Sequence, residues 1–398
     1  MTSTTERDVT GPAFPRASSR VRGMISGRIF ELLAEAARSD AVDLGLGVPG
    51  APETSPLVID EACAALRSGH NQYELPEGNR ALRRWIADTL PGDTDPGTEL
   101  TITVGATEAL MAAVLAVVDP GDEVVVFEPY YENFVNAVVL AGGVPRFVRT
   151  RPDDWRFDPA ELRAAFGPAT KAVIVSTPNN PTGHMLDESE WAEIAALCHQ
   201  WNAVVISDEI YSGFTFAKPH ISVTEVPGLR DRSFLVGSLS KTHSVSGWRL
   251  GYLRASAELT AIARRVHATV CAGAPAPLQE AVAKAAAQDP GFATPADDLR
   301  SQRDRVVTLL EKIGMECRLP DGGCYLMARV PRGESSDDFA HRLVREAGVL
   351  VAPGTVFHVD PAAGADHVRV AFNRSSEFLD EVAVRLASFR TGMSGTGL

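Results

Sequence analysis

Seven short runs rich in β-branched residues alternate with helical segments between residues 100 and 253, and this alternation restricts the fold more than any other feature. The runs are 100–104, 123–127, 145–149, 171–176, 202–207, 233–237 and 250–253. Their apolar character is continuous, which is typical of strands buried on both faces of a sheet. Helical segments such as 107–118 and 188–202 separate them. The pattern predicts an α/β domain with a mainly parallel sheet.

The chain beyond residue 290 predicts a smaller α+β unit. A long amphipathic helix is expected over 294–315, ending at Gly314. Its apolar face is formed by Leu299, Val306, Leu310 and Ile313. Short strands are expected at 324–330 and 367–372, followed by a last helix from about Ser376 to Arg390.

Composition and charge restrict the setting in which the protein works. Its 398 residues carry a net charge of 38 − 51 = −13 without a dense basic run, so no nucleic-acid partner is expected. The five cysteines are scattered and form no C-x-x-C pair, which suits a reducing compartment. The polar N-terminus lacks the apolar core of a signal peptide, and no apolar run reaches the ~18 residues of a membrane span. We therefore predict a cytoplasmic protein, without membrane contact, whose residues 1–25 are flexible.

Polar and reactive side chains follow the ends of five predicted strands. Ligands of an open parallel sheet bind beyond the carboxyl ends of its strands, so these side chains are expected to share one binding site. They come from Gly105-Ala106-Thr107, Glu128 to Tyr131, Thr177 to Gly183, Asp208 to Tyr211 and Ser238 to Lys241.

Each of these groups also has an ordinary structural interpretation. The helix start at 105–107 is either a plain helix cap or a phosphate site, to which Ser238, Ser240 and Arg249 could add donors. Lys241 is either a solvated lysine or an amine for Schiff-base chemistry. Asp208 is either a buried, hydrogen-bonded acid or the partner of a pyridinium nitrogen.

Six motifs in one order give the chain a family resemblance. They are NQYELPEGNRALRRWI (71–86), TVGATEAL (103–110), STPNNPTG (176–183), SDEIYSGF (207–214), SLSKTHSVSGWRLGY (238–252) and GAPAPLQEA (273–281). From about Ser26 to Arg390 the chain resembles the fold-type I aminotransferases of class I/II. It is most similar to the branch with kynurenine, aromatic, methionine and succinyldiaminopimelate aminotransferases.

The resemblance implies an architecture and an assembly. The expected fold is the fold-type I transferase fold dependent on pyridoxal 5′-phosphate, with a mainly parallel seven-stranded sheet flanked by helices and a smaller α+β domain. The large domain would span 46–288, and the small domain would combine 26–45 with 289–398. The family works as a homodimer with shared active sites, and Tyr73 would reach the phosphate of the neighbouring subunit.

The resemblance also implies roles for individual residues. Lys241 would form the Schiff base with pyridoxal phosphate, and Asp208 would pair with its ring nitrogen. Tyr131 would stack on the ring, while Asn180 and Tyr211 would bind its phenolic oxygen. The remaining residues would bind phosphate (Gly105, Ala106, Thr107, Ser238, Ser240 and Arg249) or the substrate (Gly47, Asn180 and Arg369, the last through the α-carboxylate).

The implied reaction moves an amino group between an L-amino acid and a 2-oxo acid by a ping-pong mechanism. The absence of an obvious second arginine for a side-chain carboxylate favours aromatic, methionine-like or other mid-sized substrates. Elimination, cyclisation or oxidation on the same fold stays open, because fold alone does not fix the reaction.

Three local features depart from the family or point elsewhere. Gly50-Ala51 replaces the Asp-Phe pair that usually follows the Gly-x-Pro element, and His243 stands where an aromatic residue is common. Residues 45–50 also match the dinucleotide fingerprint Gly-x-Gly-x-x-Gly, so a nicotinamide-dependent dehydrogenase is a remote alternative. Pro49 argues against it, because the fingerprint requires a helix to begin there.

Overall fold

A computed structural model of the protein describes residues 17–25, 29–47, 50, 53–292, 296–387 and 389, with side chains from 299 onwards in the α12 helix. Its strands are β1 (Val42–Asp43), β2 (Leu100–Val104), β3 (Glu123–Glu128), β4 (Val144–Arg149), β5 (Thr170–Ser176), β6 (Val204–Asp208), β7 (Ser233–Ser238), β8 (Leu250–Arg254), β9 (Glu316–Cys317), β10 (Tyr325–Arg329), β11 (Val349–Leu350), β12 (Ala352–Pro353) and β13 (His367–Ala371). All seven strands predicted between residues 100 and 253 are confirmed, each within two residues at either end.

The helices are α1 (Ser19–Gly23), α2 (Phe30–Arg38), α3 (Pro56–Arg67), α4 (Arg80–Thr89), α5 (Gly105–Val117), α6 (Glu132–Ala141), α7 (Pro159–Ala165), α8 (Glu188–Trp201), α9 (Leu239–Thr242), α10 (Ala257–Cys271), α11 (Ala276–Gln288), α12 (Ala296–Lys312), α13 (Ser336–Ala347) and α14 (Ser376–Ala387). Short 3-10 helices lie at Arg230–Arg232, Ser246–Trp248, Gly354–Phe357 and Pro361–Gly364. No helix in the described ranges is both long and apolar enough to cross a lipid bilayer.

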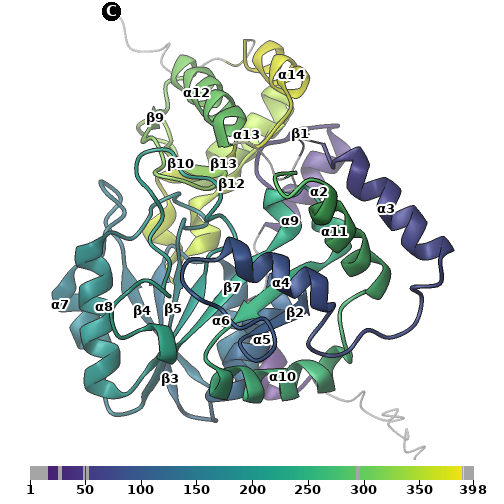
Figure 1. Ribbon diagram of the computed structural model, residues 1–398. Coiled ribbons are helices and arrows are strands. Elements are labelled where there is room, and N and C mark those ends of the chain that lie inside the picture. Colours follow the sequence, from purple (N-terminus) through teal and green to yellow (C-terminus); the bar gives the residue numbers. More distant parts are fainter. Residues whose placement is uncertain are drawn as a thin grey trace, which may run out of the picture.

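The large sheet has the strand order β2-β8-β7-β6-β5-β3-β4 (Figure 1). Pairing is parallel from β4 through β7, and β8 runs antiparallel to both β7 and β2. The mainly parallel seven-stranded sheet is therefore confirmed. One strand departs from the expected double burial, because β4 lies at the sheet edge and exposes alternate side chains.

Consecutive residues of the central strands enter different hydrophobic clusters. In β3, Val124 and Val126 pack with α5 and α6, whereas Val125 packs with α7 and α8. Alternate side chains of a strand point to opposite faces, so helices cover both faces of the sheet. This double cover explains why the strands are continuously apolar.

Local signals set the ends of helix α8. Asp187 accepts a hydrogen bond from the Glu190 N–H, and the Glu190 side chain accepts one in return from the Asp187 N–H, which forms a capping box. At the other end, Asn202 adopts the left-handed conformation that commonly closes a helix. The start of α8 is thus fixed by residues that also carry charge, a point used below.

The C-terminal part of the chain forms a second, four-stranded sheet of order β12-β13-β10-β9. Its core includes α12, whose predicted apolar face is buried and whose predicted stop, Gly314, has a positive φ of 80°. The last helix ends at Ala387, slightly earlier than predicted. Leu32 and Ala36 of α2 belong to the same core. The domain division at 46 and 289 stays a prediction, and the terminal segments 1–16 and 391–398 lie outside the described residues.

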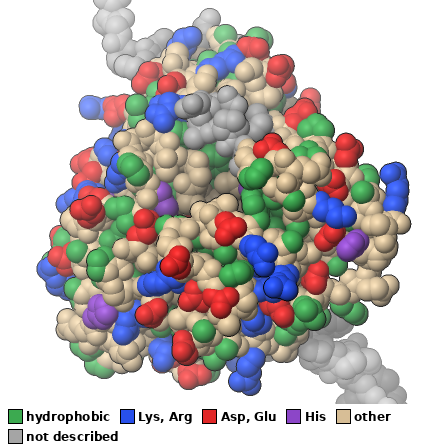
Figure 2. Space-filling model, viewed as in Figure 1, with side chains coloured by type: hydrophobic (Ala, Val, Ile, Leu, Met, Phe, Trp, Pro, Cys, Tyr) green, Lys and Arg blue, Asp and Glu red, His purple; other side chains and the backbone are tan. Residues whose placement is uncertain are grey.

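The face shown in Figure 2 carries basic and acidic side chains interspersed with one another. The same view is hollowed near its centre, between the two sheets seen in Figure 1.

Candidate active site

A cavity of about 410 Å³ lies beyond the carboxyl ends of β5, β6 and β7 and beside the start of α5. All the residues predicted for the site line it except Gly105 and Tyr73. They are Gly47, Ala106, Thr107, Tyr131, Asn180, Asp208, Tyr211, Ser238, Ser240, Lys241, Arg249 and Arg369. Six further lining residues were not predicted: Leu46, Leu110, Phe134, Ile210, Ser246 and Tyr325. Leu46 and Arg369, 369 − 46 = 323 residues apart in sequence, thus share one cavity with the residues at the strand ends.

One end of the cavity is built to receive an anion. Ala106 and Thr107 lie in the first turn of α5, where backbone N–H groups lack partners within the helix. Arg249 lies against Gly105, and a Cβ on that glycine would fall 2.2 Å from the arginine Nη2. Gly105 also has a φ of 72°, so both its conformation and its space favour glycine. Gly105 therefore acts by admitting Arg249, without lining the cavity itself.

Lys241, on the short helix α9, lines the cavity. Its Nζ donates a hydrogen bond to the carbonyl of Gly47 at 2.7 Å. Burial lowers the pKa of Lys241, and the nearby Arg369, Arg374 and Arg249 cations lower it further. A lysine with a lowered pKa holds more of the neutral amine that covalent chemistry needs. The solvated-lysine interpretation of this residue is therefore wrong.

Asp208 ends strand β6 and is buried. Its carboxylate accepts a hydrogen bond from the Ile210 N–H at 3.3 Å, and no side chain of the described residues forms an ion pair with it. Burial raises the pKa of Asp208 to about 7. A buried carboxylate of this kind is stabilised by a ligand that brings a positive charge to it.

Arg369, on β13, is held between two aromatic rings. Its guanidinium carbon lies 4.4 Å from the ring centre of Tyr325 and 4.7 Å from that of Phe357. Nη1 donates to Asn180 Oδ1 at 2.9 Å and Nη2 to the Gly45 carbonyl at 2.7 Å, whereas Nε is buried and has no hydrogen-bond partner among the described residues. A rigid, desolvated guanidinium with donor capacity to spare is suited to a carboxylate.

Tyr325 is a site residue that the sequence argument missed. Its ring packs edge to face on Tyr211, and burial raises the pKa of its hydroxyl to about 12, so the hydroxyl stays protonated. A Cβ on Gly47 would lie 1.5 Å from the Tyr325 hydroxyl oxygen, so this glycine is needed for their close approach. The only available signal was its position within the predicted strand 324–330, which gives no indication of its neighbours.

Tyr73 lies outside the cavity. Its side chain is 91% exposed, among the most exposed large residues in the described part of the chain. The prediction for this residue concerns the neighbouring subunit, so its position within one chain does not test it.

His243 lines a second cavity, on the other side of α9 from Lys241. Its Nδ1 lies 2.8 Å from the Thr242 hydroxyl, and its ring packs against Trp85 and Phe292. Burial lowers the pKa of His243 to about 4, so it is neutral near pH 7. These contacts give His243 a packing role.

The region of residues 45–50 does not form a dinucleotide-binding turn in its described part. It follows a two-residue strand, and the next helix, α3, begins at Pro56. Ala51 of the altered entry loop lies outside the described residues, while Gly50 donates its N–H to the Asn373 carbonyl at 3.0 Å.

The raised pKa of Asp208 leads to a stability prediction for the ligand-free chain. The unfolded carboxyl loses its proton near pH 4, whereas the folded one keeps it until about pH 7, so folding stability falls as pH rises between these values. The Asp208→Asn variant should lack this fall and be more stable at pH 8, by at most about 4 kcal/mol. Denaturant unfolding at pH 5 and pH 8 measures it. Asp88→Asn, at an exposed position of α4, is the control. If the free energy of unfolding changes between pH 5 and pH 8 by the same amount in wild type and Asp208→Asn, the raised pKa of Asp208 is wrong.

The chain is similar to known proteins over most of its length. A family model described as "Aminotransferase class I and II" matches residues 39–386. The chain is 36% identical over 389 residues to a probable N-succinyldiaminopimelate aminotransferase of Mycobacterium tuberculosis, covering 93% of this chain and 97% of that protein. It is 33% identical over 336 residues to mouse (Mus musculus) kynurenine–oxoglutarate transaminase 3, covering 79% of this chain and 74% of that protein. The chain also superimposes on the solved structure of YbdL from Escherichia coli, for which a methionine aminotransferase function has been identified, with a TM-score of 0.89. The two are 29% identical, and the match covers 95% of this chain and 100% of that one.

Proposed function

The chain belongs to the class I and II aminotransferases, and from this premise we propose that it moves the α-amino group of a neutral, mid-sized L-amino acid to a 2-oxo acid. Aromatic and methionine-like amino acids are the favoured donors. The proposal depends on which charges line the cavity.

Three cationic side chains line the cavity among the described residues: Lys241, Arg249 and Arg369. Lys241 supplies the amine, Arg249 lies at the anion end, and Arg369 suits the α-carboxylate that every amino acid has. A side-chain carboxylate would therefore find no further cation in the described lining, and burying it unpaired would be costly. The remaining lining includes Leu46, Leu110, Phe134 and Ile210, which favours an uncharged side chain.

Pyridoxal 5′-phosphate is the cofactor of this family, and the residues present fit it. The phosphate would lie at the start of α5 with Arg249. The protonated ring nitrogen would be the positively charged partner of the buried Asp208 carboxylate. Tyr131 would face the ring, and Asn180 and Tyr211 would contact its phenolic oxygen. When bound, the cofactor supplies a carbonyl group that binds an amine and a ring that accepts electrons.

The protein's own residues then bind the substrate and move its proton. Arg369 orients the amino acid by its α-carboxylate, because aromatic rings on both sides fix the guanidinium. Lys241 Nζ serves as the covalent amine and, once displaced by the substrate, carries the proton from Cα. The hydrogen bond from Lys241 to the Gly47 carbonyl gives the free amine a fixed position.

The names of the relatives do not choose the substrate, because they differ among succinyldiaminopimelate, kynurenine and methionine. The test is a panel of amino acids mixed one at a time with the cofactor-loaded enzyme, with release of the matching 2-oxo acid measured in a single turnover. We expect neutral aromatic or thioether amino acids to react fastest. If glutamate or aspartate reacts far faster than any neutral amino acid, the proposed substrate class is wrong.

We further propose that the enzyme is a homodimer in which Tyr73 completes the neighbouring active site. Its 91% exposed side chain is consistent with a partner that covers it. A mixture of Tyr73→Ala and Lys241→Ala subunits should then recover activity, because a mixed dimer contains one site with both residues intact. Activity after unfolding and refolding the two inactive variants together measures this recovery.

Two controls make the mixing experiment decisive. Each variant refolded alone should stay at its own low activity, and light scattering should report a dimer. If the mixture shows only the average of the two separate activities, Tyr73 does not act across the interface.

A further inference from the structure

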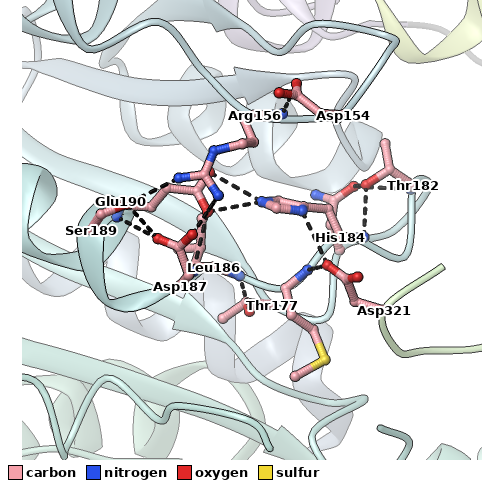
Figure 3. A network of polar contacts seen from close by, with 12 residues as sticks. Asp154, Arg156, Thr177, Thr182, His184, Leu186, Asp187, Ser189, Glu190 and Asp321 are labelled. Atoms are coloured by element: carbon pink, nitrogen blue, oxygen red, sulfur yellow. Dashed lines mark hydrogen bonds and ion pairs between the residues drawn. The ribbon is translucent and has the colours of Figure 1, made fainter. Parts of the chain in front are cut away.

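His184 lies between two carboxylates that come from distant parts of the chain (Figure 3). Its Nε2 lies 3.0 Å from Glu190 Oε2 in α8, and its Nδ1 lies 3.3 Å from Asp321 Oδ2 in the loop before β10. The His184 side chain is 10% exposed. A ring with a carboxylate at each nitrogen can satisfy both only as the imidazolium, since the neutral ring has one N–H.

The surrounding charges also require a cation at this position. Within the described part of the chain, two other cations lie beside these carboxylates: Arg156, which pairs with Asp187 and lies 3.5 Å from Glu190, and Lys218, which lies 3.8 Å from Asp321. Three carboxylates thus face two permanent cations. A protonated His184 balances the cluster formed by Arg156, His184, Asp187, Glu190, Lys218 and Asp321, which we call the charge cluster.

Asp321 lies in a loop that is hydrogen-bonded to the segments that follow strands β5 and β6 of the large sheet. Its Oδ2 accepts a hydrogen bond from the Met185 N–H at 3.2 Å, and its carbonyl accepts one from the Phe216 N–H at 2.8 Å. The Gly322 N–H donates to the Gly183 carbonyl at 3.0 Å. The side chain of His184 therefore adds a contact to this loop beside the backbone hydrogen bond between Gly322 and Gly183.

The tethered loop leads directly to the substrate end of the active site. Four residues after Asp321 the chain reaches Tyr325, whose ring lines the cavity and covers Arg369. A shift of the loop would move the Tyr325 ring, and with it one side of the aromatic sandwich around the guanidinium. The charge cluster and the carboxylate site are thus joined by a short segment of chain.

We propose that His184 is a positioning residue for substrate binding: as the imidazolium it holds the Asp321 loop so that Tyr325 keeps Arg369 aligned for the α-carboxylate. The inference rests on the role proposed above for Arg369. His184 touches neither substrate nor cofactor, and its effect passes through Asp321 and Tyr325.

The sign of the pH dependence follows from the contacts of the ring. Burial alone would lower the pKa of His184, but the hydrogen bonds to Asp321 and Glu190 outweigh burial and raise the pKa above its ordinary value. The tether is complete below this pKa and is lost as pH rises through it. The KM for the amino acid should therefore rise with alkaline pH, while the affinity for pyridoxal phosphate should not change.

The test compares three variants with wild type in the amino-acid half-reaction from pH 6.5 to 9. His184→Gln removes the cation and should raise KM by about tenfold at pH 6.5, the size expected for one hydrogen bond to a charged group. His184→Lys keeps a cation throughout this range and should hold KM low up to pH 9. His199→Gln, an exposed histidine on α8, should follow wild type.

A merely structural role would give a different result. It would lower the melting temperature of His184→Gln and leave its KM profile parallel to that of wild type, and this outcome would overturn the proposal. So would a His184→Lys enzyme whose KM rises with pH as in wild type.

A titration that needs no turnover separates this inference from the proposed function. Histidine-selective NMR should show a His184 signal that is absent in His184→Gln. The pKa measured from this signal should lie above the ordinary histidine range and should be lower in Asp321→Asn. If the measured pKa of His184 lies within or below that range, His184 does not hold the Asp321 loop as an imidazolium and the proposal is wrong. If it titrates as expected but no neutral amino acid reacts, the proposed substrate class fails instead.

Discussion

The Lys241→Ala variant should retain the fold and lose transamination by about 10⁵- to 10⁶-fold, the loss typical of removing a covalent catalytic group. The nitrogen that forms the covalent bond and the base that carries the Cα proton would be the same atom, Lys241 Nζ. In the described chain the other cations of the cavity are arginines, which do not lose a proton near neutral pH. No lining side chain can therefore substitute for both functions.

Borohydride treatment followed by peptide mass mapping tests this assignment. In wild type, reduction should attach the cofactor to the peptide that contains Lys241, and in the variant it should attach nothing. Lys312→Ala, an exposed lysine at the end of α12, should behave as wild type. A small primary amine in solution should restore part of the lost rate, because it can replace the missing base. Full activity in Lys241→Ala would remove the residue from the mechanism.

Much of this site could be predicted because its parts follow strand ends. Asp208 is the last residue of β6, and Lys241 lies in α9, just after the end of β7. The two strands are parallel neighbours, so the proximity of these residues follows from the sheet. Thr107 lies in the first turn of the helix after β2, and the position of this helix start beside Arg249 follows from the pairing of β2 with β8. Local sequence patterns and one rule of sheet topology are sufficient for these contacts.

The remaining contacts depend on packing between distant segments. Tyr325 and Phe357 enclose Arg369 because β10, β13 and the turn after β12 come together in the second sheet, and no periodicity shows which faces meet. His184 meets Asp321 across a separation of 137 residues in two irregular loops. Loops are held by individual hydrogen bonds, so no repeating pattern predicts their contacts. Both features missed by the sequence argument therefore depend on how segments distant in the sequence pack against one another.

The Arg369→Gln variant should lower kcat/KM for the amino acid by about 100- to 1000-fold, the cost of removing one partner of a buried charge pair. The loss should appear mainly as a raised KM, since in the proposed role Arg369 would contact the carboxylate before and during the reaction alike. Steady-state kinetics with the best donor of the panel measures it. The affinity for pyridoxal phosphate should stay near that of wild type, because the phosphate would bind at the other end of the cavity, with Arg249.

Arg369→Lys separates charge from geometry at the same position. Lysine keeps the positive charge but loses the planar fork and the stacking between Tyr325 and Phe357. We expect Arg369→Lys to recover only part of the loss, and amines that lack an α-carboxylate to react equally slowly with wild type and both variants. Should such amines lose as much rate in Arg369→Gln as amino acids do, Arg369 would act on the fold or the cofactor, and the carboxylate of the substrate would have to bind elsewhere.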